Sequence, residues 1–282
     1  MTGEKFGFTD DELEAHPTVY RDDLLAGNVV LVSGGGRGIG KAIAWLYARL
    51  GATVVICGRD AERLAGVKDA LAARGRTIQA IQANIRDPEQ VASLMDKVFA
   101  EHGKLDILVN NAGGQFPQLA IDFSVKGWNA VIDTNLNGTW HMMQAAARRW
   151  RDRSSPGSIV NIVAVVERGM PGVAHTCAAR AGVIYLSKTV AVEWAPLSIR
   201  VNCVAPGPIA TEGMNVYPEE ARRKFPQSNA MLRFGDAWDI AEAAVYISAT
   251  SGKFITGEVL TVDGGSQMYG ELWTVPKPDY FA

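Results

Sequence analysis

The part of the sequence best suited to binding a phosphate group is a glycine-rich run, Ser33-Gly34-Gly35-Gly36-Arg37-Gly38-Ile39-Gly40. It follows a short β-branched stretch, Asn28–Ser33, and it opens an amphipathic stretch whose apolar residues recur at helical spacing. Glycines between a strand and a helix let backbone N–H groups approach a pyrophosphate, which then lies at the positive helix N-terminus. We therefore predict a dinucleotide site there, with a tight turn that binds nothing as the alternative. Its predicted binding residues are Ser33, Gly34, Gly36, Arg37, Gly38, Ile39 and Gly40.

The next stretch of strand character decides between two dinucleotides. An acidic residue at its end would bind the ribose 2′-hydroxyl of NAD, whereas arginine there accommodates the 2′-phosphate of NADP. The stretch ends at Arg59, and Arg37 lies in the glycine turn beside it. Two guanidinium groups can hold a phosphate dianion by charge-assisted hydrogen bonds. Asp60 argues for NAD, but it lies one residue beyond the decisive position, so the sequence favours NADP.

These residues need a scaffold, and the chain alternates short apolar strands with helices. That alternation predicts an α/β fold in one domain, a Rossmann fold whose doubly wound parallel sheet has about seven strands. We expect a polar N-terminal arm at 1–26, the NADP-binding catalytic domain at 27–270 and a C-terminal tail at 271–282. The segment Gly207–Met231 is weakly patterned, and it is either a mobile lid or an ordered pair of surface helices. Predicted strands lie at 28–33, 53–57, 77–83, 105–110, 158–163, 199–204 and 258–265, and predicted helices at 61–73, 88–102, 128–150, 174–194 and 237–248, besides the helix after the glycine turn.

The composition narrows the possible functions. The chain has 282 residues and a formal charge of −2, which gives no electrostatic footprint for nucleic acid or an anionic membrane. It has no apolar run of membrane-spanning length, and we expect a cytoplasmic protein. Cys57, Cys177 and Cys203 are spread singly, without the spacing of a metal site, so no metal is expected. Cys57 and Cys203 lie in apolar runs and are expected to be buried thiols.

Several further motifs resemble the short-chain dehydrogenase/reductase family. They are Asn110-Asn111-Ala112-Gly113, Asn135 in DTNLNGT, Pro206-Gly207 followed by Thr211, and Val262–Gly265. The resemblance implies an oxidoreductase that acts on a small molecule and assembles as a homotetramer, and the arginines at 37 and 59 make NADP its expected cofactor. It also implies that Asn84 and Ile85 flank the adenine and that Asn111, Ala112 and Gly113 line the cofactor. Pro206 and Gly207 would lie beside the cofactor, and Ile209 and Thr211 would meet the nicotinamide amide.

The catalytic positions of that family are changed here. The family has a serine, a tyrosine thirteen residues later and a lysine four residues after that. The segment Ala178–Gly182 matches the family's AAKAG, which places Thr176 at the tyrosine and Arg180 at the lysine. The serine position becomes Val163, so only Asn135 of the usual set is kept. We take Asn135, Thr176 and Arg180 as the candidate catalytic residues, with Arg180 also expected to hold the nicotinamide ribose.

These changes disfavour ordinary interconversion of a carbonyl and an alcohol. A threonine hydroxyl is a far weaker acid than a phenol, whose pKa is about 10, and arginine does not exchange a proton near neutral pH. Reduction of an activated C=C bond needs less help from an acid. Hydride adds to the β-carbon of an unsaturated thioester, and hydrogen-bond donors then stabilise the enolate oxygen. Thr176 and nearby backbone amides are candidates for those donors.

A closer resemblance points to the same chemistry. NNAGGQF, GSIVNI, CAARAGV and FITGEVLTVDGG look like the trans-2-enoyl-CoA reductase branch, which is related to 2,4-dienoyl-CoA reductases. The proton-donating tyrosines of the two groups fall at Ile184 and Val165, so neither is kept. By position, Gln115 and Phe116 would line the substrate entrance. His175 is a further candidate for contact with the substrate. Tyr185 faces away from Thr176 by helical geometry, and we expect it in core packing or in a subunit contact.

The sequence therefore predicts an NADPH-dependent reductase of a 2-enoyl-CoA or a related conjugated substrate. One alternative is a dehydrogenase or reductase of an apolar alcohol, aldehyde or ketone with an altered proton donor. Another is a catalytically silent NADP-binding protein that regulates a partner.

Overall fold

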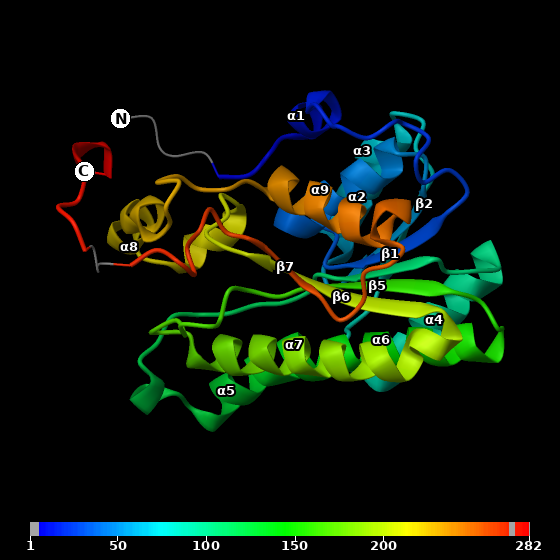
Figure 1. Cartoon of the computed structure of the whole chain (residues 1–282). Coiled ribbons are helices and arrows are strands. Elements are labelled where there is room, and N and C mark those ends of the chain that lie inside the picture. The colour runs from blue at the N-terminus through cyan, green and yellow to red at the C-terminus, as the bar shows by residue number, and fades with distance from the viewer. Residues whose placement is uncertain (1–5, 271–273, 282) are drawn as a thin grey trace.

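A parallel sheet of seven strands forms the middle layer of the molecule, in the order β3-β2-β1-β4-β5-β6-β7 (Figure 1). The computed structural model describes residues 6–270 and 274–281. The strands are short and mostly buried because helices cover both faces of the sheet. The predicted doubly wound Rossmann sheet is confirmed. Its strands are β1 (Val29–Ser33), β2 (Thr53–Gly58), β3 (Ile78–Gln82), β4 (Ile107–Asn110), β5 (Gly157–Ile162), β6 (Ile199–Pro206) and β7 (Val259–Val262).

Two helical layers enclose two large apolar cores, besides a smaller cluster around Val163 and Ile184. One core joins the sheet to α2 (Gly38–Arg49), α3 (Ala61–Ala72) and α9 (Ala237–Ser248). The other joins it to α4 (Pro88–His102), α6 (Gly138–Asp152) and α7 (Ala174–Trp194). Figure 1 shows the two layers above and below the sheet. Strand order reverses between β1 and β4, and the loops after these strands open a crevice there.

The predicted helix at 128–150 is divided by one turn of a different kind. Helix α5 (Val125–Ile132) runs into a π-helical turn, Asp133–Asn137, which leads into α6. A π-turn widens the helix by one residue, and such turns are frequent at functional sites. Asn135 lies in this turn and is 1% exposed.

The segment before β1 packs onto the α2 layer, although its composition suggested a polar arm. Helix α1 (Asp10–Ala15) begins with a capping box in which Thr9 and Glu12 satisfy each other's backbone N–H groups. Leu13 and Leu25 are buried in the same core as α2. Residues 1–5 of the predicted arm, and 271–273 and 282 of the predicted tail, lie outside the described residues.

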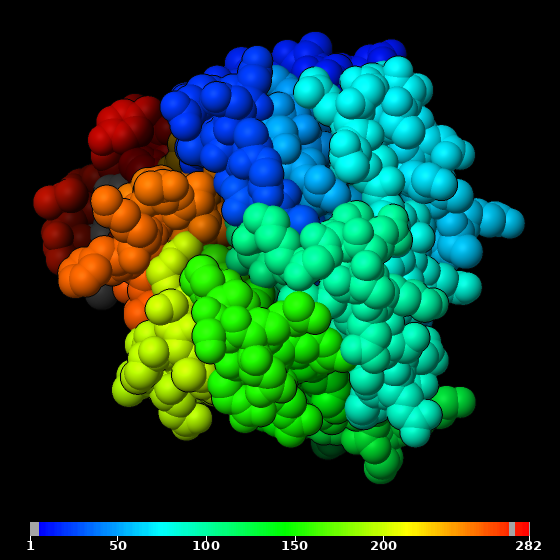
Figure 2. All heavy atoms as spheres, turned by 90° about the vertical axis from the view of Figure 1, so that its right-hand side faces the viewer, coloured from blue at the N-terminus to red at the C-terminus, as the bar shows by residue number. Residues whose placement is uncertain are grey.

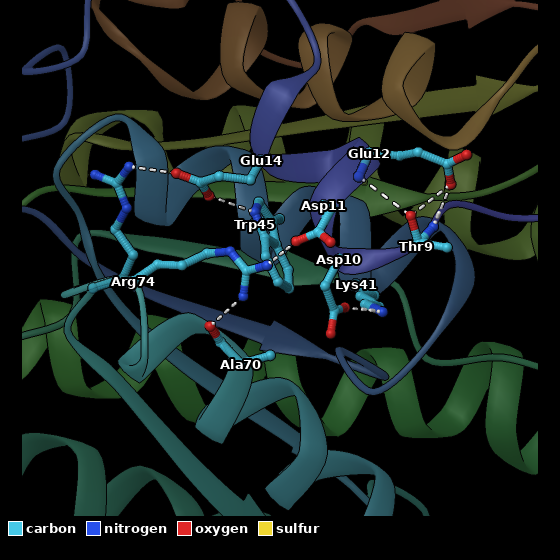
Figure 3. A network of polar contacts seen from close by, with 10 residues as sticks. Thr9, Asp10, Asp11, Glu12, Glu14, Lys41, Trp45, Ala70 and Arg74 are labelled. Atoms are coloured by element: carbon cyan, nitrogen blue, oxygen red, sulfur yellow. Dashed lines mark hydrogen bonds and ion pairs between the residues drawn. The ribbon is translucent and has the colours of Figure 1, made fainter.

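The acidic residues of α1 form ion pairs and a hydrogen bond with basic and aromatic side chains of α2 and of the segment after α3 (Figure 3). This pairing explains why an acidic stretch lies on the body of the protein. The contacts are Lys41 with Asp10 (2.5 Å), Arg74 with Asp11, and Trp45 Nε1, which donates to Glu14 (2.9 Å). Figure 2 shows the molecule from the side that is opposite α8 in Figure 1. The segment before β1, in dark blue, lies along the top, beside the residues that follow it in the sequence.

The weakly patterned segment at 207–231 forms short helices, which agrees with the second prediction made for it, ordered surface helices. They are a 3-10 turn, Glu212–Val216, then α8 (Glu219–Lys224) and a second 3-10 turn, Phe225–Ser228. A bridge between Ile209 and Gly235 ties its beginning to the segment that leads into α9. We call residues 207–231 the lid segment.

Cys57 and Cys203 are fully buried, as predicted, and burial raises the pKa of their thiols to about 12 and about 11. No helix in the described part of the chain is long and apolar enough to span a membrane. Among the same residues, no group of three histidine, cysteine or acidic side chains is placed to hold a metal ion.

Candidate active site

The carboxyl ends of the strands open into a cleft of about 640 Å³, a size suited to a small-molecule ligand. The glycine turn after β1, the loop after β4, the start of α7 and the lid segment all contribute to its walls. The topology therefore brings together residues that are far apart in the sequence. The predicted site residues that line the cleft are Arg37, Ile39, Asn111, Gly113, Asn135, Thr176, Arg180, Pro206, Gly207, Ile209 and Thr211.

Close backbone packing makes glycine necessary in the turn after β1. Gly34 has φ of +69°, a conformation that side chains disfavour, and a Cβ there would lie 2.9 Å from the Cα of Ala112. A Cβ at Gly40 would lie 2.3 Å from the carbonyl oxygen of Gly34. Helix α2 begins directly after the turn, and its N-cap residue, Arg37, makes no side-chain capping bond. The N–H groups of the first helical turn are therefore left without a side-chain cap at the edge of the cleft.

Hydrogen bonds among four predicted cofactor residues hold the two loops of the cleft together. The Ser33 hydroxyl, fully buried, accepts from the backbone N–H groups of Asn111 and Ala112 at 3.1 Å each. The Asn111 amide donates to the carbonyl oxygens of Ser33 (3.1 Å) and Gly34 (3.2 Å). These bonds fix the glycine turn against the loop after β4, so Ser33 and Asn111 position the walls of the cleft.

An exposed arginine, Arg59, directly follows β2, and the carboxylate next to it, that of Asp60, is already bonded to another residue. Asp60 caps α3 by accepting from the Arg63 backbone N–H (3.1 Å), and it also pairs with the Arg63 guanidinium (2.9 Å). Arg59 is exposed. A Cβ at Gly36 would lie 3.3 Å from the Cβ of Arg63, which places this third arginine beside the glycine turn. Sequence reasoning missed Arg63, although its position one turn into α3 was the available signal.

The two residues expected at the adenine lie after β3. The Asn84 side chain accepts from the Arg86 backbone N–H (3.2 Å), and it is half-buried. Ile85 is buried, and a Cβ at Gly138 would approach its side chain to 2.8 Å. Ile85 therefore packs against the start of α6, while Asn84 holds the turn that leads into α4.

The strongest electrostatic feature of the cleft is the buried guanidinium of Arg180 on α7. The residue is 8% exposed, and burial lowers its pKa to about 10. None of the carboxylates in the described residues forms an ion pair with it. The guanidinium lies against the loop after β4, where a Cβ at Gly113 would come within 2.2 Å of Nη2. A desolvated cation without a counter-charge favours a ligand with negative or electron-rich groups.

Thr176, one turn before Arg180, is 2% exposed and lines the cleft. Its hydroxyl lies 3.3 Å from Nδ1 of His175. His175 is fully buried against the rings of Phe116 (4.7 Å) and Phe123 (4.4 Å). Burial lowers its pKa, which keeps the imidazole neutral. His175 is not one of the residues that line the cleft, so it supports Thr176 and the loop of Phe116 from behind.

Both polar atoms of the Asn135 side-chain amide hydrogen-bond to the backbone of one residue in the loop after β4. Its Oδ1 accepts from the Gly114 N–H and its Nδ2 donates to the Gly114 carbonyl, each at 3.0 Å. The π-helical turn thereby fixes the loop that faces Arg180. The arrangement makes Asn135 a positioning residue for that loop.

Three of the positions to which the resemblance assigns a serine or a proton-donating tyrosine carry apolar residues. Val163 and Val165 line the cleft, and Ile184 is buried in a cluster with Val163. Tyr185 points away from the cleft, as helical geometry predicted, and is 70% exposed, with Lys188 over its ring at 5.3 Å. Of the two roles expected for Tyr185, core packing is therefore wrong, because its side of α7 is uncovered in the single chain, and a subunit contact stays a prediction.

The cleft does contain a phenol that sequence reasoning missed. Tyr217, in the lid segment, lines the cleft together with Gln115, and the Gln115 amide donates to its phenolic oxygen. Gln115 was expected at the substrate entrance from its place after the NNAG motif. Tyr217 gave no such signal, because it lies outside every motif and in a segment without periodicity.

The contact between Gly113 and Arg180 gives a direct test of this geometry. Gly113→Ala should displace the guanidinium and weaken NADPH binding by about 10-fold or more, since the new methyl group would occupy its place. Gly114→Ala is the matched control, because nothing lies within 4 Å of a Cβ there, and we expect its affinity to change by less than about 3-fold. Fluorescence titration with NADPH measures both. Equal affinities in the two variants would contradict the placement of Arg180.

Comparison with known proteins agrees with the architecture. The chain is 37% identical over 257 residues to the peroxisomal 2,4-dienoyl-CoA reductase of Arabidopsis thaliana, which covers 87% of this chain and 86% of that protein. It is 36% identical to a 3-oxoacyl-[acyl-carrier-protein] reductase of Thermotoga maritima, over 86% of this chain and 98% of that one. A solved short chain dehydrogenase from Bacillus anthracis superposes with a TM-score of 0.83 at 37% identity, over 88% of this chain and 100% of that chain.

A family model described as enoyl-(acyl carrier protein) reductase matches residues 34–267, from the glycine turn to the segment after β7. The resemblance in the sequence motifs is thereby confirmed, and the similarity to a 2,4-dienoyl-CoA reductase supports the branch that was expected. The chain belongs to the short-chain dehydrogenase/reductase family of oxidoreductases.

Proposed function

We propose that this protein is an NADPH-dependent reductase of an activated C=C bond in a conjugated acyl thioester, such as a 2-enoyl-CoA. The observation that carries the proposal is the pairing of a buried, uncompensated Arg180 with apolar walls at Val163 and Val165. Such a cleft favours negative charge on a substrate oxygen, and it offers no acid at the usual catalytic position. The proposal includes assembly as a homotetramer in the cytoplasm, as the family resemblance implies.

The residues around the cleft fit a pyridine dinucleotide. The glycine turn and the uncapped first turn of α2 suit the pyrophosphate, and Arg37 and Arg59 suit a 2′-phosphate. Asp60, the residue that argued for NAD, is engaged by the start of α3 and by Arg63. When bound, the reduced nicotinamide supplies the hydride.

The chain's own residues then have to stabilise the charge that this transfer creates on the substrate. Arg180 remains cationic at neutral pH even with its pKa lowered to about 10, so it favours an enolate oxygen over a neutral carbonyl. Thr176 can donate a weaker hydrogen bond from the same face of α7. Asn135 and Gly113 keep the loop after β4 in contact with Arg180, which preorganises the site before substrate arrives.

Carbonyl reduction is the second candidate, and the similarity to a 3-oxoacyl-[acyl-carrier-protein] reductase favours it. That reaction delivers a proton to an alkoxide oxygen, for which Thr176 is a poor donor. A dehydrogenase of an apolar alcohol meets the same obstacle in reverse. The third alternative, a silent NADP-binding protein, predicts affinity for NADPH without turnover.

A substrate panel of equal chain length separates these functions. We expect 2-enoyl-CoA or 2,4-dienoyl-CoA to be reduced about 100-fold faster than the 3-oxoacyl-CoA, because reduction of the C=C bond depends less on a strong general acid than reduction of the carbonyl group. NADPH oxidation gives the rate, and mass spectrometry of the thioester identifies the reduced bond. Faster turnover of the 3-oxoacyl-CoA would show a carbonyl reductase, and tight NADPH binding without any turnover would show the silent protein.

The choice of dinucleotide has its own test. Arg59→Asp should lower the ratio of kcat/KM for NADPH to that for NADH by about 100-fold, because it replaces an attraction to the 2′-phosphate with a repulsion. Lys68→Asp, on the exposed side of α3, makes the same change in charge away from the cleft and should leave the ratio unaltered. An unaltered ratio in Arg59→Asp would remove the assignment of NADP.

A further inference from the structure

The phenol of Tyr217 lines the cleft from the lid segment and meets Gln115 of the loop after β4. It lines the same cleft as Thr176 and Arg180. The ring packs edge-on against Phe225 at 5.1 Å, and its backbone N–H donates to the Met214 carbonyl at 3.1 Å. The phenol is therefore held in place by the short helices of the lid segment.

The polar contact of the phenol leaves its own hydrogen available. The Gln115 amide donates to the phenolic oxygen, so the oxygen acts as an acceptor in that bond. No other hydrogen bond of the phenol occurs among the residues that the structure describes. Gln115 follows Gly114, whose backbone is fixed by Asn135. The lid phenol is thus connected through two residues to the π-helical turn of the active site.

We propose that Tyr217 is the general acid of this enzyme and delivers the proton that completes reduction of the C=C bond. This inference rests on the proposed function. It assigns to the lid segment the phenol that the family carries on α7, at the position that Thr176 occupies here. Tyr217 is then a catalytic residue, and Gln115 is the positioning residue that orients its oxygen.

The step balances with the groups already named. Hydride from NADPH forms a C–H bond at the β-carbon, and the π-electron pair moves toward the thioester oxygen as an enolate. The enolate pair then forms a C–H bond at the α-carbon while the O–H bond of Tyr217 breaks. The products are the saturated thioester, NADP⁺ and a phenolate, which the Gln115 amide stabilises until water returns a proton.

The surroundings keep the phenol in its acidic form before reaction. Burial, together with the Cys177 thiol beside it, raises the pKa of Tyr217 above its ordinary value. The phenol therefore stays protonated at neutral pH, and deprotonation occurs only when an enolate is present to accept the proton. Cys177 follows Thr176 on α7, which agrees with a phenol that reaches over the start of that helix.

Reduction in D₂O distinguishes a proton donor from a structural residue. The wild-type enzyme should place deuterium on one face of the α-carbon of a 2-enoyl-CoA, because the phenol approaches from one side. Tyr217→Phe should lower kcat by about 100-fold, change KM by less than about 3-fold and place deuterium on both faces, since water replaces the phenol. NMR of the product measures the faces. Tyr185→Phe, which removes an exposed phenol from α7, is the control and should behave as wild type.

Each remaining outcome decides the assignment. Tyr217→Phe with wild-type kcat would overturn it, and so would a slower variant that still deuterates one face, since the phenol would then only orient the substrate. Unchanged NADPH affinity and melting temperature in the variant verify its fold. If the wild-type enzyme reduces no enoyl thioester, the proposed function fails and this inference fails with it. Turnover by wild type with an unaffected Tyr217→Phe removes the inference alone.

Discussion

A buried positive charge without a counter-charge organises this active site. Removing a guanidinium from water is costly, and Arg180 receives no compensation from the carboxylates of the described residues. The protein keeps it in place by packing, with the side-chain-free surface of Gly113 against its Nη2. The loop that presents Gly113 is held in turn by Asn135 through Gly114 and by Ser33 through Asn111. The cleft is therefore built around a charge that no carboxylate of the described residues pairs with.

The fold supplies the rigidity that such an arrangement requires. The glycine turn and the loop after β4 meet where the strand order reverses, so the two loops bond to each other above the sheet. Helix α7 presents Thr176 and Arg180 on one face because they lie one turn apart, while Tyr185 projects outward. The lid segment closes the remaining side with Tyr217. The frame thus fixes the directions in which the side chains at these positions point, whatever residues occupy them.

The sequence was sufficient for the frame and for most of the residues that line the cleft along the glycine turn and the loop after β4. Periodicity and the glycine turn predicted the parallel sheet, and the position of Arg59 after β2 followed from the strand pattern alone. The spacing of residues in the sequence could not show that both ends of the Asn135 amide hydrogen-bond to the Gly114 backbone, because this depends on the π-helical turn. Nor could it place Tyr217, since the lid segment has no periodicity and its direction is set by distant contacts. The acidic residues of α1 suggested a polar arm because their partners, Lys41 and Arg74, come from other parts of the chain.

The need of Arg180 for a ligand can be measured by replacing it with an apolar side chain of similar length. If its charge is uncompensated until a ligand binds, Arg180→Met should leave the ligand-free protein equally stable, or more stable by about 1–3 kcal/mol. The same variant should lose most of the rise in melting temperature that NADPH gives to the wild type. Denaturant unfolding with and without NADPH measures both quantities. A ligand-free variant that is destabilised by several kcal/mol, with the NADPH-induced rise intact, would show that Arg180 is a structural residue with a partner inside the protein.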